Sequence, residues 1–293
     1  MSRGSWVGPE MEESIRKADI LIEALPYIQQ FHQKVVVVKY GGSAIDHPTA
    51  MKGILQDLVF LRAVGIHPVL VHGGGPMITK KLSEGGKKSA FIDGMRVTDA
   101  EAIRVVNEEL EKVNGRLVTQ IKALNGDAEG LVPRHWVIIA QPHARCAELG
   151  FVGSVRMVQA GRIRQALRHN AIPVISPVGI GDGEQLYNIN ADDVASEVAA
   201  YLKAEKLVLL TNVRGILRHA SDEGSLISTL SVKEAKTLIE RQVIQEGMIP
   251  KVKACVNALR IGVKKTHIID ASIPHAMLLE IFTKQGIGTE IVH

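Results

Sequence analysis

The chain has 293 residues, of which 46% are hydrophobic and only 4% aromatic, and its net charge at pH 7 is +4. This length allows one large domain or two joined ones, with a core of mainly aliphatic side chains. The small charge and the lack of a Lys/Arg run argue against nucleic-acid binding, and no stretch has the ~18 apolar residues of a membrane span. Cys146 and Cys255 are far apart without a metal-type spacing. We therefore expect a reduced, soluble, cytoplasmic protein.

The first thirty residues predict an amphipathic helix. Apolar residues recur at steps of four and three and form one stripe: Met11, Ile15, Ala18, Ile22 and Leu25. Pro26 should stop or kink this helix. Two interpretations are open, because the stripe could pack on its own domain or reach a second subunit.

Short apolar runs then alternate with longer helical patterns. We expect strands at 35–40, 67–72, 136–141, 172–177, 206–211 and 266–270, and helices at 49–65, 100–124, 191–204 and 252–262. This alternation predicts an α/β fold, a three-layer αβα sandwich around a mostly parallel central sheet. Residues 177–187 form the clearest Gly- and Pro-rich loop, and we place a lobe boundary there. The expected domains are 1–33, an oligomerisation helix, then a lobe at 34–178 and a lobe at 179–293.

The strand at 35–40 ends in an unusual way. Four valines are followed by Lys39 and then by Gly41 and Gly42. Ligands of open parallel sheets bind beyond the carboxyl ends of the strands. Glycines let backbone N–H groups approach an anion, and a lysine adds a point charge. A solvated lysine in an ordinary turn would explain a single stretch of this kind equally well.

The strand at 67–72 supplies a second example. It runs into Gly73, Gly74, Gly75 and Pro76, a tight turn that opens a helix whose first N–H groups can hold phosphate. An HGGG run also forms the oxyanion hole of esterases, but the chain lacks the G-x-S-x-G nucleophile motif. The Walker A and G-x-G-x-x-G patterns are absent as well. Any phosphate site here must use a different arrangement of glycines.

Three charged or polar clusters follow. Arg96 comes just before Thr98 and Asp99, where a helix begins, and a surface arginine beside a helix cap is the alternative explanation. The other two clusters, Asn188-x-Asn190-x-Asp192 and Pro250-Lys251, also precede or open helices.

The alternation of Asn188, Asn190 and Asp192 would put three polar groups on one face of extended backbone. We find this hard to explain by packing. Lys251 lies in the first turn of a helix that begins at Pro250, where a cation opposes the helix dipole. Its position therefore indicates function rather than stability.

In chain order these segments resemble the amino-acid kinase family, and within it the branch that acts on N-acetyl-L-glutamate. The resemblance covers residues 10 to 293 and rests on the ordered set VVVKYGGS, VHGGGP, GMRVTDAE, LGFVG, PVISPVG, YNINADDVA, EGMIPKV and GIGTEIV. It implies a single, mostly parallel sheet with helices on both sides. The acylated amino acid would bind, and dimers would form, at the lobe 34–178, whereas ATP would bind at the lobe 179–293.

The resemblance also implies a reaction. ATP would phosphorylate the side-chain carboxylate of N-acetyl-L-glutamate to N-acetyl-L-glutamyl 5-phosphate, a step of arginine biosynthesis. Lys39 and Lys251 would flank the phosphoryl group, with Asp192 holding both lysines. The implied phosphate-binding residues are Gly41, Gly42, Gly73 and Gly74, and the substrate-binding residues are Gly74, Gly75, Arg96, Asn188 and Asn190. Mg²⁺ would be carried by the ATP phosphates, without a metal site in the protein.

Two departures from the family pattern stand out. A Gly-Lys-Asp loop usual after the long helix is missing, and the nucleotide-lobe turn reads Thr211-Asn212-Val213-Arg214-Gly215 instead of Thr-Asp-Val-Pro-Gly. We still assign Thr211, Asn212 and Gly215 to the nucleotide lobe. Two alternatives are open: a kinase of carrier-protein-linked aminoadipate in lysine biosynthesis, or a degraded kinase that serves as an arginine-sensing subunit.

The C-terminal segment is the last candidate site. We expect a helix from near Pro274 to Gly286, and a packing helix with a solvated Glu280 would be the ordinary interpretation. Resemblance to arginine-inhibited members with an N-terminal kinked helix instead implies L-arginine as feedback inhibitor, held by His267, Glu280, Gly286 and Gly288. It also implies a homo-oligomer, from dimer to homohexamer through the N-terminal helix, and raises a PII-type signalling protein as a partner.

Overall fold

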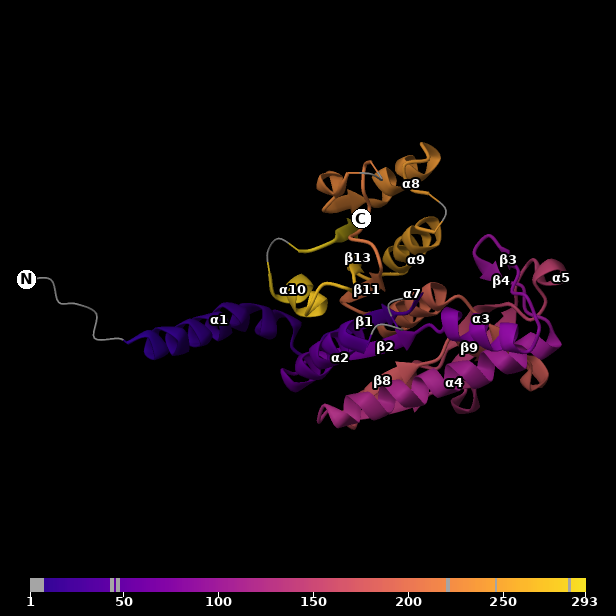
Figure 1. Cartoon of the computed structure of the whole chain (residues 1–293), viewed down its shortest axis with the longest axis horizontal. Helices are drawn as coiled ribbons and strands as arrows, with labels where there is room; N and C mark the ends of the chain where they lie inside the picture. The colour runs from indigo at the N-terminus through magenta and orange to yellow at the C-terminus, as the bar shows by residue number, and fades with distance from the viewer. Residues whose placement is uncertain (1–7, 43–44, 46–47, 220–221, 246, 284–285) are drawn as a thin grey trace, which may run out of the picture.

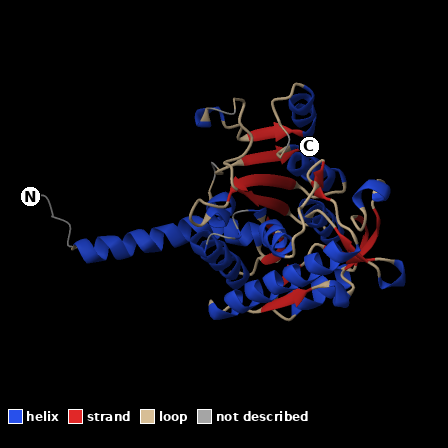
Figure 2. Cartoon of the chain, turned by 45° about the vertical axis from the view of Figure 1, so that its right-hand side comes forward, coloured by secondary structure: helices blue, strands red, loops and turns tan. Residues whose placement is uncertain are grey.

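The computed structural model describes residues 8–42, 45, 48–219, 222–245, 247–283 and 286–293. Within these residues the main sheet has eight strands. Several of them lie side by side, in red, in Figure 2. In spatial order they are β12 (Thr229–Ser231), β14 (Thr289–Val292), β13 (Lys265–Asp270), β11 (Lys206–Thr211), β1 (Val35–Tyr40), β2 (His67–His72), β8 (Ile172–Ile175) and β5 (Ala128–Leu131). All neighbours pair in parallel except β13 and β14, which are antiparallel.

Helices cover both faces of this sheet. Val37 of β1 packs in a core with α7 (Ala191–Leu202) and α9 (Ile249–Arg260). Its neighbours Val36 and Val38 point the other way, into a core with α2 (Pro48–Ala63), α4 (Ala100–Ala123) and α10 (Ala276–Phe282). Alternate side chains of one strand therefore enter two separate cores, as expected of a central strand. The predicted three-layer αβα sandwich is confirmed.

A second sheet corrects the expectation of a single one. It has four strands in the order β10 (Leu186–Asn188), β9 (Val178–Ile180), β6 (Ile138–Pro142) and β7 (Gly153–Val158), and β3 (Phe91–Ile92) pairs with β4 (Met95–Arg96) in a separate hairpin. The predicted loop at 177–187 was wrong, because it holds β9 and β10. Its glycines serve close packing: a Cβ at Gly179 would lie 2.7 Å from Ala140, and one at Gly181 would lie 2.7 Å from Tyr187.

The remaining helices are short. They are α3 (Gly75–Glu84), α5 (Cys146–Leu149), α6 (Ala160–Arg168), α8 (Val232–Glu240), and the 3₁₀ turns η2 (Pro133–His135), η3 (Asp182–Glu184) and η4 (Glu223–Ser225). The last helix, α10, ends at Phe282 rather than Gly286, because Thr283 has extended backbone. None of the described helices is long and apolar enough to cross a membrane.

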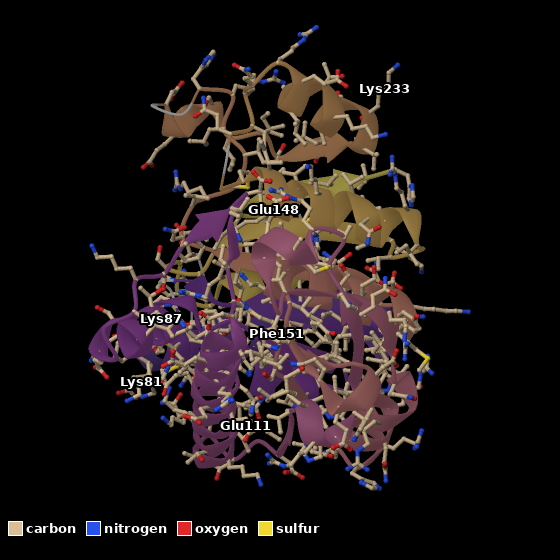
Figure 3. All side chains as sticks on the ribbon, turned by 90° about the vertical axis from the view of Figure 1, so that its right-hand side faces the viewer. Lys81, Lys87, Glu111, Glu148, Phe151 and Lys233 are labelled. Atoms are coloured by element: carbon tan, nitrogen blue, oxygen red, sulfur yellow. The ribbon has the colours of Figure 1, made fainter. Side chains whose placement is uncertain are left out.

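The two expected lobes share one continuous sheet, since β1 pairs with both β2 and β11. They still occupy different parts of the molecule. Glu111 of α4 and Lys233 of α8 lie at opposite ends of the view in Figure 3. The lobe boundaries stay a prediction.

Helix α1 (Pro9–Phe31) projects from the body of the protein (Figures 1 and 2). It continues through Pro26 instead of stopping there. Only its last turns dock: Phe31 is buried, and the Tyr27 ring packs edge-on against Phe282 at 6.4 Å. The apolar stripe is exposed, including Ile22 at 68%. Packing of the stripe on its own domain is therefore the wrong interpretation.

Candidate active site

Three charged side chains from distant parts of the chain meet at one point. Lys39 lies near the end of β1, and its Nζ is 2.8 Å from Oδ1 of Asp192 in the first turn of α7. Lys251, in the first turn of α9, donates a hydrogen bond of 2.9 Å to the other carboxylate oxygen of Asp192. One carboxylate thus holds two ammonium groups.

Burial and charge act against each other in this cluster. Asp192 is 4% exposed and Lys39 is 7% exposed. Burial alone would raise the pKa of Asp192, but the charges of Lys39 and Lys251 overcome it and lower the pKa to about 2. Burial also lowers the pKa of Lys39, while the charge of Asp192 opposes that shift. Two lysines thus face one ionised carboxylate, and this excess of basic groups suits an anionic ligand.

A cavity of about 210 Å³ opens beside the cluster. Predicted site residues line much of it: Lys39, Gly42, Gly73, Gly74, Gly75, Arg96, Asn188 and Asn190. Apolar side chains such as Ile78, Leu110 and Val152 complete the wall. The structure therefore gathers a cation cluster, an arginine, two amides and three consecutive glycines around one space.

Arg96 is less free than the sequence suggests. Its guanidinium donates to Ser89 Oγ, to Thr79 Oγ1 (2.8 Å) and to the carbonyl of Gly75 (3.1 Å), and it stacks 4.7 Å from the Phe91 ring centre. These contacts use three of the five N–H donors of an arginine and leave two for a ligand. The residues that hold Arg96 were missed, because nothing in their spacing marks them.

Both asparagines have local structural partners. Asn190 caps α7, since its Oδ1 accepts from the Asp192 backbone N–H at 2.8 Å. Asn188 donates to Thr98 Oγ1 at 3.1 Å. The expectation that packing would not explain this run was wrong, and the residues do not share an extended strand, because α7 begins at Ala191. Asp99, not Thr98, caps α4 by accepting from Glu101 and Ala102.

The glycines also have structural reasons. A Cβ at Gly41 would lie 3.0 Å from the Gly73 backbone, so the two strand ends touch there. Gly42 has a φ of +70°, which disfavours a side chain. A Cβ at Gly74 would lie 2.6 Å from Leu110.

One predicted donor is engaged elsewhere. The N–H of Gly73 donates to the carbonyl of Tyr40 at 2.8 Å, extending the pairing of β1 with β2. In this structure it does not face a phosphate. The donors at hand are the backbone N–H groups at the start of α3, which have no partner inside the helix.

Two of the three predicted nucleotide-lobe residues line a cavity, and the third does not. Thr211 and Asn212 line a cavity of about 570 Å³ at the ends of β11 and β13, together with Asp270 and Ser272. Gly215 is not among its lining residues: its φ is +148°, and a Cβ there would lie 2.6 Å from Thr289 Oγ1. A glycine is therefore required at this position by the backbone conformation and by the close contact.

The family model of the amino acid kinases matches residues 34–270. The chain belongs to the amino acid kinase family. Two relatives named acetylglutamate kinase, from Desulforamulus reducens and Moorella thermoacetica, are 46% and 48% identical to it over 285 and 289 residues. The alignments cover 96% and 95% of this chain and 99% and 98% of the relatives. The resemblance stated from the motifs, including its branch, is confirmed.

A solved structure adds a more distant comparison. N-acetylglutamate synthase from Neisseria gonorrhoeae, complexed with coenzyme A and N-acetyl-glutamate, superposes with a TM-score of 0.84 at 26% identity. The match covers 94% of this chain and 63% of the synthase, so the chain spans about two thirds of that protein. The same synthase with coenzyme A and L-arginine gives a TM-score of 0.81 at 25% identity and covers 94% of this chain and 65% of the synthase.

This amino acid kinase chain has a second polar cavity, of about 480 Å³, at the opposite edge of the sheet. It lies at the N-terminal ends of β11 and β13, between α10 and the last turns of α1. Glu280, Gly286 and Gly288 line it, beside Lys206 and Glu290.

His267 is not among the lining residues. It is 1% exposed, and its Nδ1 lies 2.7 Å from Oε1 of Glu280. Glu280 is buried rather than solvated and also accepts from the Ile287 N–H at 3.1 Å. His267, predicted to hold arginine directly, therefore contacts Glu280 and not the cavity.

Proposed function

We propose that the chain transfers the γ-phosphoryl group of ATP to the side-chain carboxylate of N-acetyl-L-glutamate. The observation that carries this proposal is the cluster in which buried Asp192 holds Lys39 and Lys251 beside a cavity that contains Arg96. The names of the two relatives described above point to the same reaction. The product is N-acetyl-L-glutamyl 5-phosphate, a step of arginine biosynthesis.

The reaction needs charge stabilisation rather than a base. A carboxylate is already ionised at pH 7, so its oxygen attacks the γ-phosphorus directly while the bond to the β-phosphate oxygen breaks and ADP leaves. The obstacle is the approach of two anions. Lys39 neutralises charge on the transferring group, and Lys251 neutralises charge on the leaving oxygen. Asp192 keeps the two cations apart at fixed positions, and α3 offers N–H donors.

The small cavity suits an acylated amino acid. The guanidinium charge and a free N–H of Arg96 pair with the α-carboxylate, and the amides of Asn188 and Asn190 face the acylamino group. Ile78, Leu110 and Val152 provide apolar contact for the acetyl methyl group.

ATP supplies the phosphoryl group, over the ends of β11 and β13, where Thr211 and Asn212 lie. Both oxygens of Asp192 are paired with lysines, which leaves this carboxylate poorly suited to a metal. No group of three or more metal-ligating side chains occurs among the described residues. We therefore propose that Mg²⁺ is held by the ATP phosphates. The free thiols of Cys146 and Cys255 fit a reducing compartment, and we place the reaction in the cytoplasm.

A substrate panel tests this proposal. Acyl phosphate formed with ATP and Mg²⁺ is trapped with hydroxylamine, and N-acetyl-L-glutamate is compared with L-glutamate, N-acetyl-L-aspartate and carrier-linked aminoadipate. We expect N-acetyl-L-glutamate to have the highest kcat/KM by at least about tenfold. Preference for the carrier-linked substrate would favour the lysine-pathway alternative. No turnover of any substrate, with arginine binding retained, would favour the degraded sensor.

We further propose that L-arginine binds in the cavity between α1 and α10. Glu280 supplies a buried carboxylate for the guanidinium, and the Gly286 and Gly288 backbone supplies carbonyl acceptors. Lys206 pairs with the α-carboxylate of the ligand. The related synthase has been solved with L-arginine, which supports this choice of ligand.

The exposed stripe of α1 supports a further step in assembly. Met11, Ile15 and Ile22 are 57%, 46% and 68% exposed on a helix that projects from the body. We propose that this stripe packs on the α1 helix of another dimer and assembles dimers into a hexamer. A PII-type partner remains a prediction from the family resemblance.

A further inference from the structure

The carbonyl groups of the three glycines after β2 differ in their hydrogen-bond partners. Carbonyl oxygens facing a phosphoryl group would repel it, whereas N–H groups would bind it. The carbonyl of Gly74 accepts from Ile78 N–H at 3.1 Å, and that of Gly75 accepts from Thr79 Oγ1 and from Arg96. These two carbonyls are thus satisfied at the start of α3. The carbonyl of Gly73 lies outside the helix and needs another donor.

His72 provides that donor. Its ring is fully buried at the end of β2, and its Nδ1 lies 3.0 Å from the Gly73 carbonyl oxygen. Burial lowers the pKa of His72 to about 4, against the opposing effect of the Gly73 bond. The ring is therefore neutral at pH 7 and carries one proton.

Asn114 of α4 decides which nitrogen carries the proton. Its Nδ2 donates to the Val174 carbonyl at 2.9 Å, which fixes the orientation of the amide, and the same Nδ2 lies 3.1 Å from His72 Nε2. An amide nitrogen donates and does not accept, so Nε2 must be the acceptor. The proton is thus on Nδ1, facing the Gly73 carbonyl. Asn114 is itself 3% exposed, so water does not compete for this arrangement.

The Gly73–Gly74 peptide is the place where such control matters. Glycine on both sides lets a peptide plane rotate at little steric cost. In a trans peptide the carbonyl and the following N–H point in opposite directions. When the Gly73 carbonyl is held towards the buried ring, the Gly74 N–H is directed away from it.

We propose that His72, set in its Nδ1–H form by Asn114, is a positioning residue that locks the Gly73–Gly74 peptide so that the Gly74 N–H faces the phosphoryl site. The chain Asn114–His72–Gly73 then links α4 to the site. This role rests on the proposed kinase reaction, but the proton position can be measured without turnover.

The direct test is ¹⁵N NMR of histidine-labelled protein, in which the ring nitrogen shifts identify the tautomer. The His72 signals are assigned by their loss in His72→Asn. We expect the Nδ1–H form across pH 6 to 8. The Nε2–H form would overturn the proposal, whether or not the protein proves to be a kinase.

Kinetics test the consequence. Asparagine can place an amide N–H near the position of Nδ1, whereas leucine cannot. We expect His72→Leu to lower kcat about 100-fold with KM within about threefold, and His72→Asn to retain at least about ten times more activity than His72→Leu. Equal losses in the two folded variants, or near-normal kcat in His72→Leu, would mean that the ring only fills space.

A second pair of variants serves if His72 variants fail to fold. In Asn114→Asp, the carboxylate raises the His72 pKa and binds Nε2–H. Below that pKa the imidazolium keeps Nδ1–H, and above it the remaining proton moves to Nε2 and the Gly73 bond is lost. We expect kcat of Asn114→Asp to fall as pH rises, whereas Asn114→Ala follows the wild-type profile at a lower level. Identical pH profiles of the two variants would contradict the proposal.

Discussion

The two edges of the main sheet differ in the balance of their charges. At the C-terminal ends of the strands, two lysines share Asp192, so cations are in excess. At the N-terminal ends, Lys206 lies near Glu280, and Lys265 pairs with Glu290, so charges of the two signs are balanced. The C-terminal edge therefore suits an anion, whereas the N-terminal edge suits a ligand that carries both a cation and an anion.

The pKa shifts agree with this contrast. Burial would raise the pKa of Glu280, but its contacts with His267, Ile287 and Lys206 lower it, so the side chain is ionised. Burial lowers the pKa of His267, which favours its neutral form. The negative charge of Glu280 is thus available to a ligand, whereas both oxygens of Asp192 are paired with lysines.

The largest expected effect is on stability, from Asp192→Asn. It leaves two cations without their shared carboxylate, one of them buried, and should lower the free energy of unfolding by about 3–5 kcal/mol. The pKa of Asp192 is depressed to about 2 from its ordinary 3.8. Its contribution is therefore present above pH ~4 and is lost as pH falls towards 2. Urea unfolding against pH should show this loss in the wild type and not in Asp192→Asn.

The next largest effect is on catalysis. Lys251→Ala and Lys39→Ala should each lower kcat by about 10²–10³, or about 3–4 kcal/mol, because one charge at the transferring phosphoryl group is lost. Circular dichroism checks the fold, and calorimetry should find arginine binding intact, because the other edge is untouched. Near-normal turnover in either variant would remove that lysine from the mechanism.

Arg96→Lys sharpens the account of substrate binding. A lysine has a single ammonium group, which cannot keep the contacts to Thr79 and Gly75 and also pair with a carboxylate as the guanidinium does. We expect the KM for N-acetyl-L-glutamate to rise about tenfold or more, with a smaller change in kcat. An unchanged KM would show that the α-carboxylate binds elsewhere.

The smallest effect on catalysis is expected at the other edge. Glu280→Gln should weaken L-arginine inhibition while kcat stays roughly unchanged, because the guanidinium loses its anionic partner.

Deleting residues 1–30 should also weaken inhibition and reduce the mass seen by light scattering to that of a dimer. An unchanged mass after the deletion would contradict assembly through α1. Loss of arginine binding in Lys251→Ala but not in Glu280→Gln would show that arginine does not bind at the N-terminal edge.

The sequence predicts which edge of the sheet carries the catalytic residues, but it does not predict the second sheet or the contacts that hold those residues. Continuous apolar runs such as the four valines of β1 mark central strands, and the residue after such a run marks the ligand edge. The second sheet was missed because β9 and β10 are short and lie in a presumed Gly-rich loop. The strand predicted at 136–141 is β6, and nothing in its residues shows which sheet it joins. Side-chain contacts such as Arg96 with Ser89 or His267 with Glu280 leave no periodic signal in the chain.

Glycines and asparagines show why some roles need the structure. Gly41 and Gly73 are glycines partly because their backbones touch, and Asn190 caps a helix as well as lining the cavity. One residue can satisfy a structural and a chemical requirement at once. Sequence patterns reveal that a special residue is present, but not which requirement it meets.

The most direct test of the central claim is ³¹P NMR of ATP, Mg²⁺ and N-acetyl-L-glutamate with the wild-type protein and with Lys251→Ala. We expect an acyl phosphate signal that grows together with ADP in the wild type and forms about 10²–10³-fold more slowly in the variant. ADP formation without an acyl phosphate, or equal rates in the two proteins, would contradict it.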